Sequence, residues 1–156
     1  MARYSKLTYG LTGAFFNTAK RRQEEAEAEE IARNLLDLLG VHDVADELVT
    51  NLPYGMQRRV EMARALAVEP KILFLDEPTA GMNPEELAEM MDIIRQVHRE
   101  FGLAIFLIEH HMKFVMELCE HIQTLVFGEV IAEGTPEEIQ NNPKVIEAYL
   151  GEEVET

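Results

Sequence analysis

The chain has 156 residues, 47% of them hydrophobic, which is enough for one compact domain with its own core. Its 29 acidic residues against 14 Lys and Arg give a formal net charge of -15, which disfavours binding to nucleic acid or anionic lipid. The only cysteine, Cys119, excludes an internal disulfide and fits a reducing compartment, where it is expected to be a buried apolar residue.

The N-terminal part holds an uncharged run followed by a helical pattern. Residues 7–19 are too short to span a bilayer, and their Thr and Asn side chains argue against a signal peptide. Residues 24–30 are strongly acidic, and four apolar residues then recur at helical spacing before Gly40. A solvated helix with one buried face is expected over this acidic and apolar stretch. The chain as a whole is expected to be soluble and untargeted.

The middle of the chain predicts a strand, a helix and a second strand. Residues 71–76 and 101–109 each contain an unbroken apolar run, which is typical of buried strands. Between them, Asn83-Pro84-Glu85-Glu86 supplies an N-cap, a first-turn proline and a capping box. This order implies a right-handed parallel crossover. A further helix is predicted just before it, over residues 57–68.

The C-terminal part predicts a hairpin and two short helices. Residues 122–127 and 129–132 flank Gly128 as two antiparallel strands. Thr135-Pro136-Glu137-Glu138 then begins a helix with a capping box, and Pro143 opens a last helix that ends near residue 150.

The first predicted strand ends in Asp76-Glu77, an arrangement that can offer one carboxylate to Mg²⁺ and another to an attacking water. Alone this signal is weak, because many strands end in an acidic residue that only faces solvent. The residues upstream strengthen it. They are Leu52, Pro53, Tyr54, Gly55, Met56 and Gln57.

That stretch precedes Asp76 at the distance separating the signature motif from Walker B in ATP-binding-cassette ATPases, and residues 51–84 resemble this family. Asn-Leu-Pro-Tyr-Gly, Ile-Glu-His-x-Met and the closing Gly-Thr-Pro-Glu-Glu-Ile further resemble the ATP subunits of branched-chain amino-acid importers. The resemblance covers nearly the whole chain. Pro53 stands where the general pattern has serine, as is normal in this subfamily, and Met56 replaces the usual glutamine.

The resemblance implies roles for individual residues. Asp76 matches the Mg²⁺-associated aspartate, Glu77 the glutamate that polarises water, and His110 the switch histidine that contacts the γ-phosphate. Residues 52–57 would meet ATP held by a partner, as the signature does. The D-loop matches Ala80, Gly81, Met82 and Asn83.

Asn83 is also fully explained as an N-cap, so its D-loop role rests on the resemblance alone. His110 and His111 are adjacent and do not share a helix face, which disfavours a metal site made by this pair.

The implied fold is α/β, the C-terminal portion of a P-loop NTPase domain. Residues 1–68 would form a helical subdomain that ends in the signature helix. Residues 69–156 would form a partial ATPase core with a parallel sheet and a C-terminal hairpin with helices. The implied ligands are ATP and Mg²⁺. The implied partners are a second cassette, bound head to tail, and a membrane permease that holds the subunit at the cytoplasmic face.

A phosphate-binding loop needs Gly-x-x-x-x-Gly-Lys-Ser/Thr, and none of the nine glycines is followed by lysine. Judged against the family, the sequence begins just beyond the Q-loop, and the isolated chain is expected to be inactive. Two functions stay open: an importer ATPase subunit seen without its N-terminal piece, or a non-hydrolytic module that docks on an intact cassette or permease.

The absent Walker A strand also has a consequence for the predicted sheet. Without that neighbour, both strands are expected to be poorly covered and to promote self-association. The side chains expected to be exposed are Phe74, Leu75, Phe106, Leu107 and Ile108.

Overall fold

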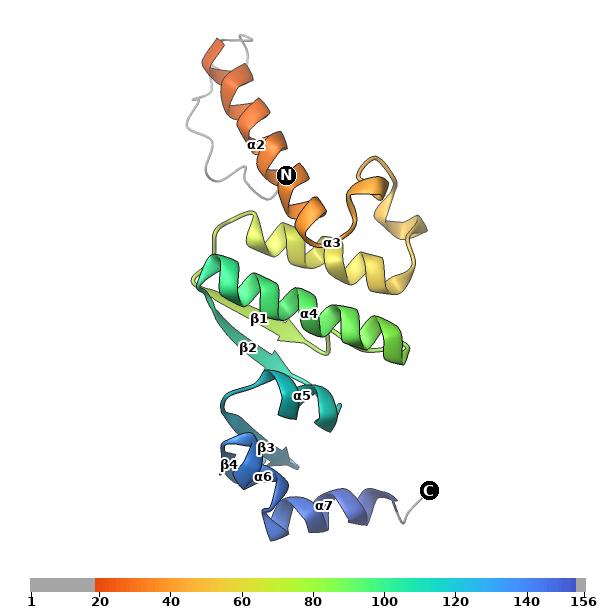
Figure 1. The fold of residues 1–156 in the computed structure, drawn as a ribbon, viewed down its shortest axis with the longest axis vertical. Coiled ribbons are helices and arrows are strands. Elements are labelled where there is room, and N and C mark those ends of the chain that lie inside the picture. The colour runs from red at the N-terminus through yellow and green to blue at the C-terminus, as the bar shows by residue number, and fades with distance from the viewer. Residues whose placement is uncertain (1–18, 154–156) are drawn as a thin grey trace. The chain divides into compact units, whose positions relative to one another are not determined.

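The structure is a computed structural model that describes residues 19–153. The expectation for residues 7–19 therefore lies, except for its last residue, outside the described residues. The elements are, in chain order, α2 (Ala19–Leu38), η2 (His42–Val44), η3 (Val49–Asn51), α3 (Tyr54–Leu66), β1 (Ile72–Asp76), α4 (Pro84–Phe101), β2 (Ala104–Ile108), α5 (Met112–Leu118), β3 (Ile122–Val126), β4 (Glu129–Gly134), α6 (Pro136–Gln140) and α7 (Pro143–Glu153) (Figure 1).

The chain divides into two compact units, Met1–Ile108 and Glu109–Thr156. The division differs from the boundary expected between residues 68 and 69, which falls inside the first unit between α3 and β1 and stays a prediction. Among residues 19–153, no helix is both long and apolar enough to cross a membrane.

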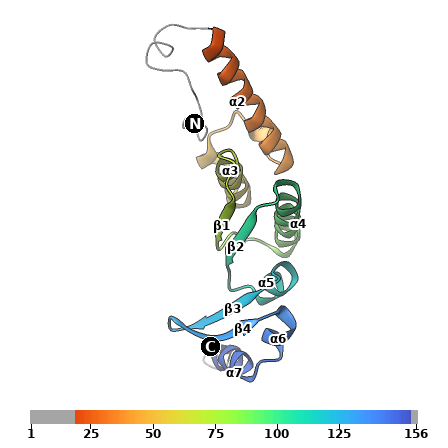
Figure 2. The same ribbon diagram turned by 90° about the vertical axis from the view of Figure 1, so that its left-hand side faces the viewer.

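The first unit contains the predicted strand, helix and strand. β1 and β2 pair in parallel without a break, from Ile72 opposite Ala104 to Asp76 opposite Ile108. The connecting helix α4 lies along one face of this pair (Figure 2). Parallel strands joined through a helix are the expected α/β arrangement.

Both ends of α4 are set by local signals. At its start, Asn83 Oδ1 accepts from the backbone N–H groups of Glu85 and Glu86, and the Glu86 carboxylate accepts from Asn83 N–H, as the capping box predicts. At its end, Gly102 takes a left-handed conformation with φ 58°. The strand expected over residues 101–109 therefore starts late, because Phe101 is still the last residue of α4.

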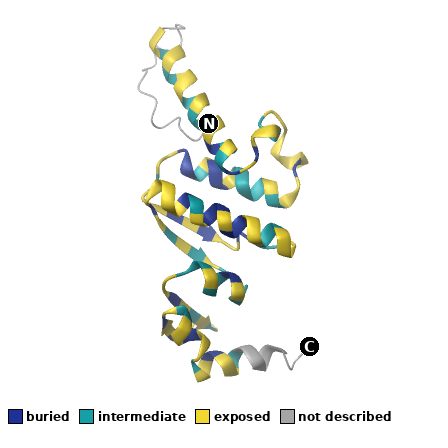
Figure 3. Ribbon diagram, in the orientation of Figure 1, coloured by how far each residue is buried: buried dark blue, intermediate teal, exposed yellow. Residues whose placement is uncertain are grey.

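The expectation of two fully buried strands is wrong on one face. In β1, Leu73 and Leu75 are buried, whereas Phe74 between them is 71% exposed. In β2, Phe106 is 54% exposed and Leu107 is half-buried. The buried stripe of α4 covers a single side of the sheet (Figure 3). Phe74, Phe106 and Ile108 are thus exposed as expected, but Leu75 is not.

Helices α2 and α3 start earlier than the apolar pattern suggested. α2 already begins at Ala19, before the acidic stretch, and ends before Gly40, whose φ is 66°. α3 begins at Tyr54 rather than at residue 57, directly after Pro53, which stands at the N-cap position without a side-chain hydrogen bond. It buries Met62, Ala63 and Leu66.

The second unit is built around the predicted hairpin. β3 and β4 pair antiparallel, with an irregularity at Thr124/Leu125, and the two-residue turn Phe127-Gly128 has φ of 49° and 83°. β4 extends to Gly134, beyond the predicted end, and α7 to Glu153. The Thr135 capping box is confirmed. The buried core of this unit consists of Ile122, Ala132, Ile139 and Val145.

Candidate functional site

The signature turn, residues 52–57, follows the short helix η3 and includes the first residues of α3. Leu52 is buried, and its backbone carbonyl accepts a hydrogen bond of 2.8 Å from the Gln57 side-chain amide. The first α-helical bond runs from Gln57 N–H to the Pro53 carbonyl at 3.0 Å. The amides from Tyr54 to Met56 precede that bond, so helix geometry directs them outward at the positive end of α3. Such an end favours an anion.

Tyr54 forms a paired unit with Arg58 at this end of α3. The Arg58 guanidinium lies over the Tyr54 ring, 4.7 Å from its centroid, and donates to the Tyr54 hydroxyl. Arg58 Nη1 also contacts Glu61 Oε2 at 2.7 Å, and the hydrogen bond to Glu61 is the main cause that raises the pKa of Arg58. Sequence reasoning missed Arg58, although its spacing of four from Tyr54 on a helix was a usable signal.

The acidic pair lies at the C-terminal end of β1. Asp76 is the last strand residue and is exposed, and Glu77 donates its backbone N–H to the Ile108 carbonyl of β2 at 2.9 Å. Glu77 has a positive φ of 43°, which costs a non-glycine residue about 1 to 3 kcal/mol and is common at functional sites. The exposed carboxylate of Asp76 is a suitable ligand for Mg²⁺, because proteins bind this hard cation through few carboxylates together with phosphates.

The D-loop follows in two tight turns. Ala80 N–H donates to the Glu77 carbonyl at 3.2 Å, and Met82 N–H to the Thr79 carbonyl at 3.1 Å. Thr79 is fully buried and anchors the segment, while Gly81 takes φ 72°. The loop ends at Asn83, the N-cap of α4.

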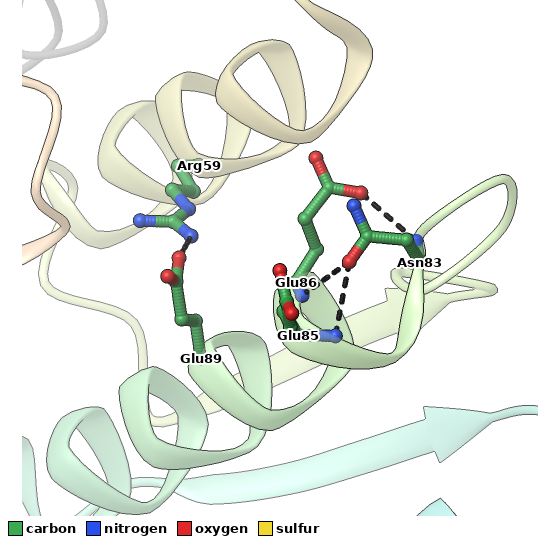
Figure 4. A network of polar contacts seen from close by, with 5 residues as sticks. All are labelled: Arg59, Asn83, Glu85, Glu86 and Glu89. Carbon is green, nitrogen blue, oxygen red and sulfur yellow. Dashed lines mark hydrogen bonds and ion pairs between the residues drawn. The ribbon is translucent and has the colours of Figure 1, made fainter.

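The structure brings the signature turn and the D-loop together. A Cβ placed on Gly55 would lie 3.8 Å from Met82 Cε and 3.6 Å from Glu86 Oε1, which are ordinary contact distances. A Cβ on Gly81 would lie 4.0 Å from Tyr54 Cδ1. The signature turn and the D-loop, which are separated in sequence by most of α3 and by β1, therefore lie next to each other. Figure 4 shows the start of α4 beside α3.

His110 belongs to the second unit, just before α5. Its ring stacks on that of His111, with centroids 5.0 Å apart. The carboxylate of Glu109, whose side chain is fully buried, accepts from the backbone N–H groups of His110 at 3.1 Å and His111 at 3.4 Å. Glu109 thus holds the backbone at His110 and His111, a role that sequence reasoning missed. Among residues 19–153, no group of three or more His, Cys, Asp or Glu is arranged to hold a metal ion.

Comparisons with known proteins show which family this chain resembles. The family model for ABC transporters matches residues 5–80, and the model described as "Branched-chain amino acid ATP-binding cassette transporter" matches residues 129–155. The chain is 42% identical over 152 residues to the high-affinity branched-chain amino acid transport ATP-binding protein LivG of Salmonella typhimurium, covering 97% of this chain and 60% of LivG. It is 40% identical to BraF of Pseudomonas aeruginosa, with the same shares covered.

Solved structures give the same result. An ATP-binding cassette of an ABC transporter in its ADP conformation matches with TM-score 0.72 and 29% identity, over 80% of this chain and 50% of that one. A nucleotide-free cassette matches with TM-score 0.68 and 30% identity, over 91% and 56%.

The chain belongs to the ATP-binding-cassette family of transporter ATPases. Within it, the chain groups with the branched-chain amino acid transport ATP-binding proteins. It spans about 60% of the length of the curated relatives it matches. The family binds nucleotide, and the α/β architecture expected from the resemblance is confirmed.

Proposed function

We propose that this chain supplies the signature half of a nucleotide site in a branched-chain amino-acid importer, so that its signature turn and D-loop meet ATP held by a second cassette bound head to tail. The closeness of Gly55 to Met82 and Glu86 carries the proposal, because it places the signature turn beside the D-loop. The outward amides of the first turn of α3 suit the charge of a phosphate.

The residues of the chain's own site have separate proposed roles. Asp76 would hold Mg²⁺ together with the nucleotide phosphates, and the ion would neutralise charge that develops on them. Glu77 would accept the proton of the attacking water, and His110 would donate a hydrogen bond to the γ-phosphate. A phosphate cradle from another segment or chain completes this site, since Gly-x-x-x-x-Gly-Lys-Ser/Thr does not occur in these 156 residues.

The names of two relatives support the remaining parts of the proposal. LivG and BraF are named for high-affinity branched-chain amino acid transport. We infer that this chain acts in the same uptake, on the cytoplasmic side, through permease subunits. The alternative is a non-hydrolytic module that docks on an intact cassette or permease.

ATP dependence of association distinguishes the two functions. The chain is mixed with intact BraF whose hydrolytic glutamate is changed to glutamine, and complexes are measured by analytical ultracentrifugation with and without MgATP. A signature role gives a complex only with MgATP, and Gly55→Asp abolishes it because a carboxylate would face the phosphate. A complex that forms equally without nucleotide and survives Gly55→Asp would instead identify a docking module.

A further inference from the structure

The start of α3 and the start of α4 are joined by two contacts one helical turn apart. Gly55 on α3 faces Glu86 on α4, and four residues further along α3 the Arg59 guanidinium forms an ion pair with Glu89, three residues further along α4 (Figure 4). Residues three and four apart lie on one helix face, so both contacts belong to one seam between the helices.

Arg59 is held tightly at this seam. Its side chain is only 15% exposed, whereas Glu89 is 63% exposed. A Cβ on Gly40 would lie 3.3 Å from Arg59 Nη1, so the guanidinium also lies against the chain that leaves α2. A charged group with so little access to water depends on its partner, because burying it unpaired is costly.

The Arg59–Glu89 pair differs from ion pairs that lie within a single helix. Arg58–Glu61 in α3 and Arg95–Asp92 in α4 each join two residues of the same helix, so neither pair fixes one helix against another. Arg59 and Glu89 are 30 positions apart and fix one helix against another. Their contact limits how far the α3 start can slide along α4.

The functional segments lie at the end of the same seam. The signature turn leads into α3, and the D-loop leads into α4 through the Asn83 capping box. Sliding of one helix along the other would therefore separate Tyr54 from Gly81 and Gly55 from Met82.

We propose that Arg59 and Glu89 are positioning residues that hold the signature turn and the D-loop in register, so that both reach a partner's nucleotide together. The effect on a partner's nucleotide rests on the proposed function. The relative position of the signature turn and the D-loop, in contrast, is a property of this chain alone. Neither residue touches nucleotide in this account, since each acts through the helix that carries it.

The first test uses the chain alone, without nucleotide. Its nine glycines give a sparse amide spectrum after glycine-selective ¹⁵N labelling. Glu89→Gln is expected to shift the Gly55 and Gly81 signals and to speed their hydrogen exchange. Asp92→Asn, which removes a local pair on the same helix, is expected to leave both signals in place. Unchanged Gly55 and Gly81 signals in a folded Glu89→Gln chain would overturn the proposal.

The second test measures turnover in a cassette completed by the N-terminal fragment of BraF. Glu89→Gln is expected to lower kcat about tenfold or more with KM for ATP unchanged, because the residues that meet nucleotide are displaced. The charge exchange Arg59→Glu with Glu89→Arg is expected to restore part of the lost kcat. A kcat equal to that of Asp92→Asn would also overturn the proposal. If the completed parent cassette itself does not hydrolyse ATP, the proposed function fails, and the glycine spectrum still decides whether the pair sets the register.

Discussion

Phe74 on β1 and Phe106 on β2 are register partners whose ring centroids lie 5.5 Å apart, at an interplanar angle of 48°. Both rings point away from α4, on the face where Ile72 and Ile108 are also about half exposed. Parallel sheets are normally covered on both faces. We therefore expect this exposed apolar face to determine whether the isolated chain self-associates.

We predict that the chain alone self-associates through the Phe74–Phe106 face. Phe74→Thr with Phe106→Thr should move the size-exclusion peak toward the monomer, because large apolar side chains are removed from the contact. Phe127→Ser is the control, since Phe127 is exposed on the turn of the other unit. A monomeric parent at high concentration, or rescue by the control alone, would contradict this assignment.

A separate prediction concerns nucleotide. Isothermal titration should detect no tight MgATP binding by the isolated chain, because Asp76 and Glu77 lack a phosphate cradle in this sequence. Binding with a micromolar dissociation constant that Asp76→Ala abolishes would reveal a working site without that motif.

Gly55→Ala should separate fold from function. A Cβ at this position would meet only ordinary contact distances, and alanine favours a helix by up to about 1 kcal/mol over glycine. Thermal stability should therefore stay equal or rise slightly, while MgATP-dependent association with BraF weakens as the methyl group crowds the phosphate. A large drop in melting temperature would show that Gly55 is required for packing.

Glu77→Gln and His110→Ala test the hydrolytic roles in a completed cassette. The amide keeps the shape of Glu77 but cannot accept a proton, so ATP binding should persist while turnover falls about 10²-fold or more. His110→Ala should also reduce turnover. Steady-state rates within about twofold of the parent for both variants would rule out these roles.

Asn83→Ala should cost about 1 kcal/mol of stability through loss of the N-cap, measured by urea denaturation. Asn83→Asp should retain most of it, because a carboxylate oxygen can accept the same two N–H bonds and is favoured at a helix start. Equal losses for both variants would mean that the amide has a further partner beyond the cap.

Local signals in the sequence were sufficient for most elements. Asn83 and Thr135 each predicted a capping box, and Gly128 predicted the hairpin turn, because these residues act on neighbours within a few positions. The different burial of Phe74 and Leu75 was beyond such reasoning, since an apolar run does not reveal which faces are covered. The Arg59–Glu89 contact was equally invisible, because nothing in either segment names a partner 30 positions away.

The candidate site divides in the same way. Asp76, Glu77 and residues 52–57 were found by spacing and resemblance, and their individual roles stay predictions. Gln57 is expected to meet a partner's nucleotide, and that stays a prediction; in the structure its side-chain amide donates to the Leu52 carbonyl. Glu109 carried no motif of its own, and only its burial and two backbone contacts identify it.

The two ends of α4 have a consequence for how this segment can evolve. Asn83 fixes where the helix begins, and Gly102 fixes where it stops. The strands before and after it, β1 and β2, pair with each other without a break. One inserted residue would rotate everything beyond it by about 100° around the helix axis, turning the apolar stripe away from the sheet. Length changes between residues 84 and 101 should thus be purged among functional homologues, whereas the Phe127-Gly128 turn can tolerate them.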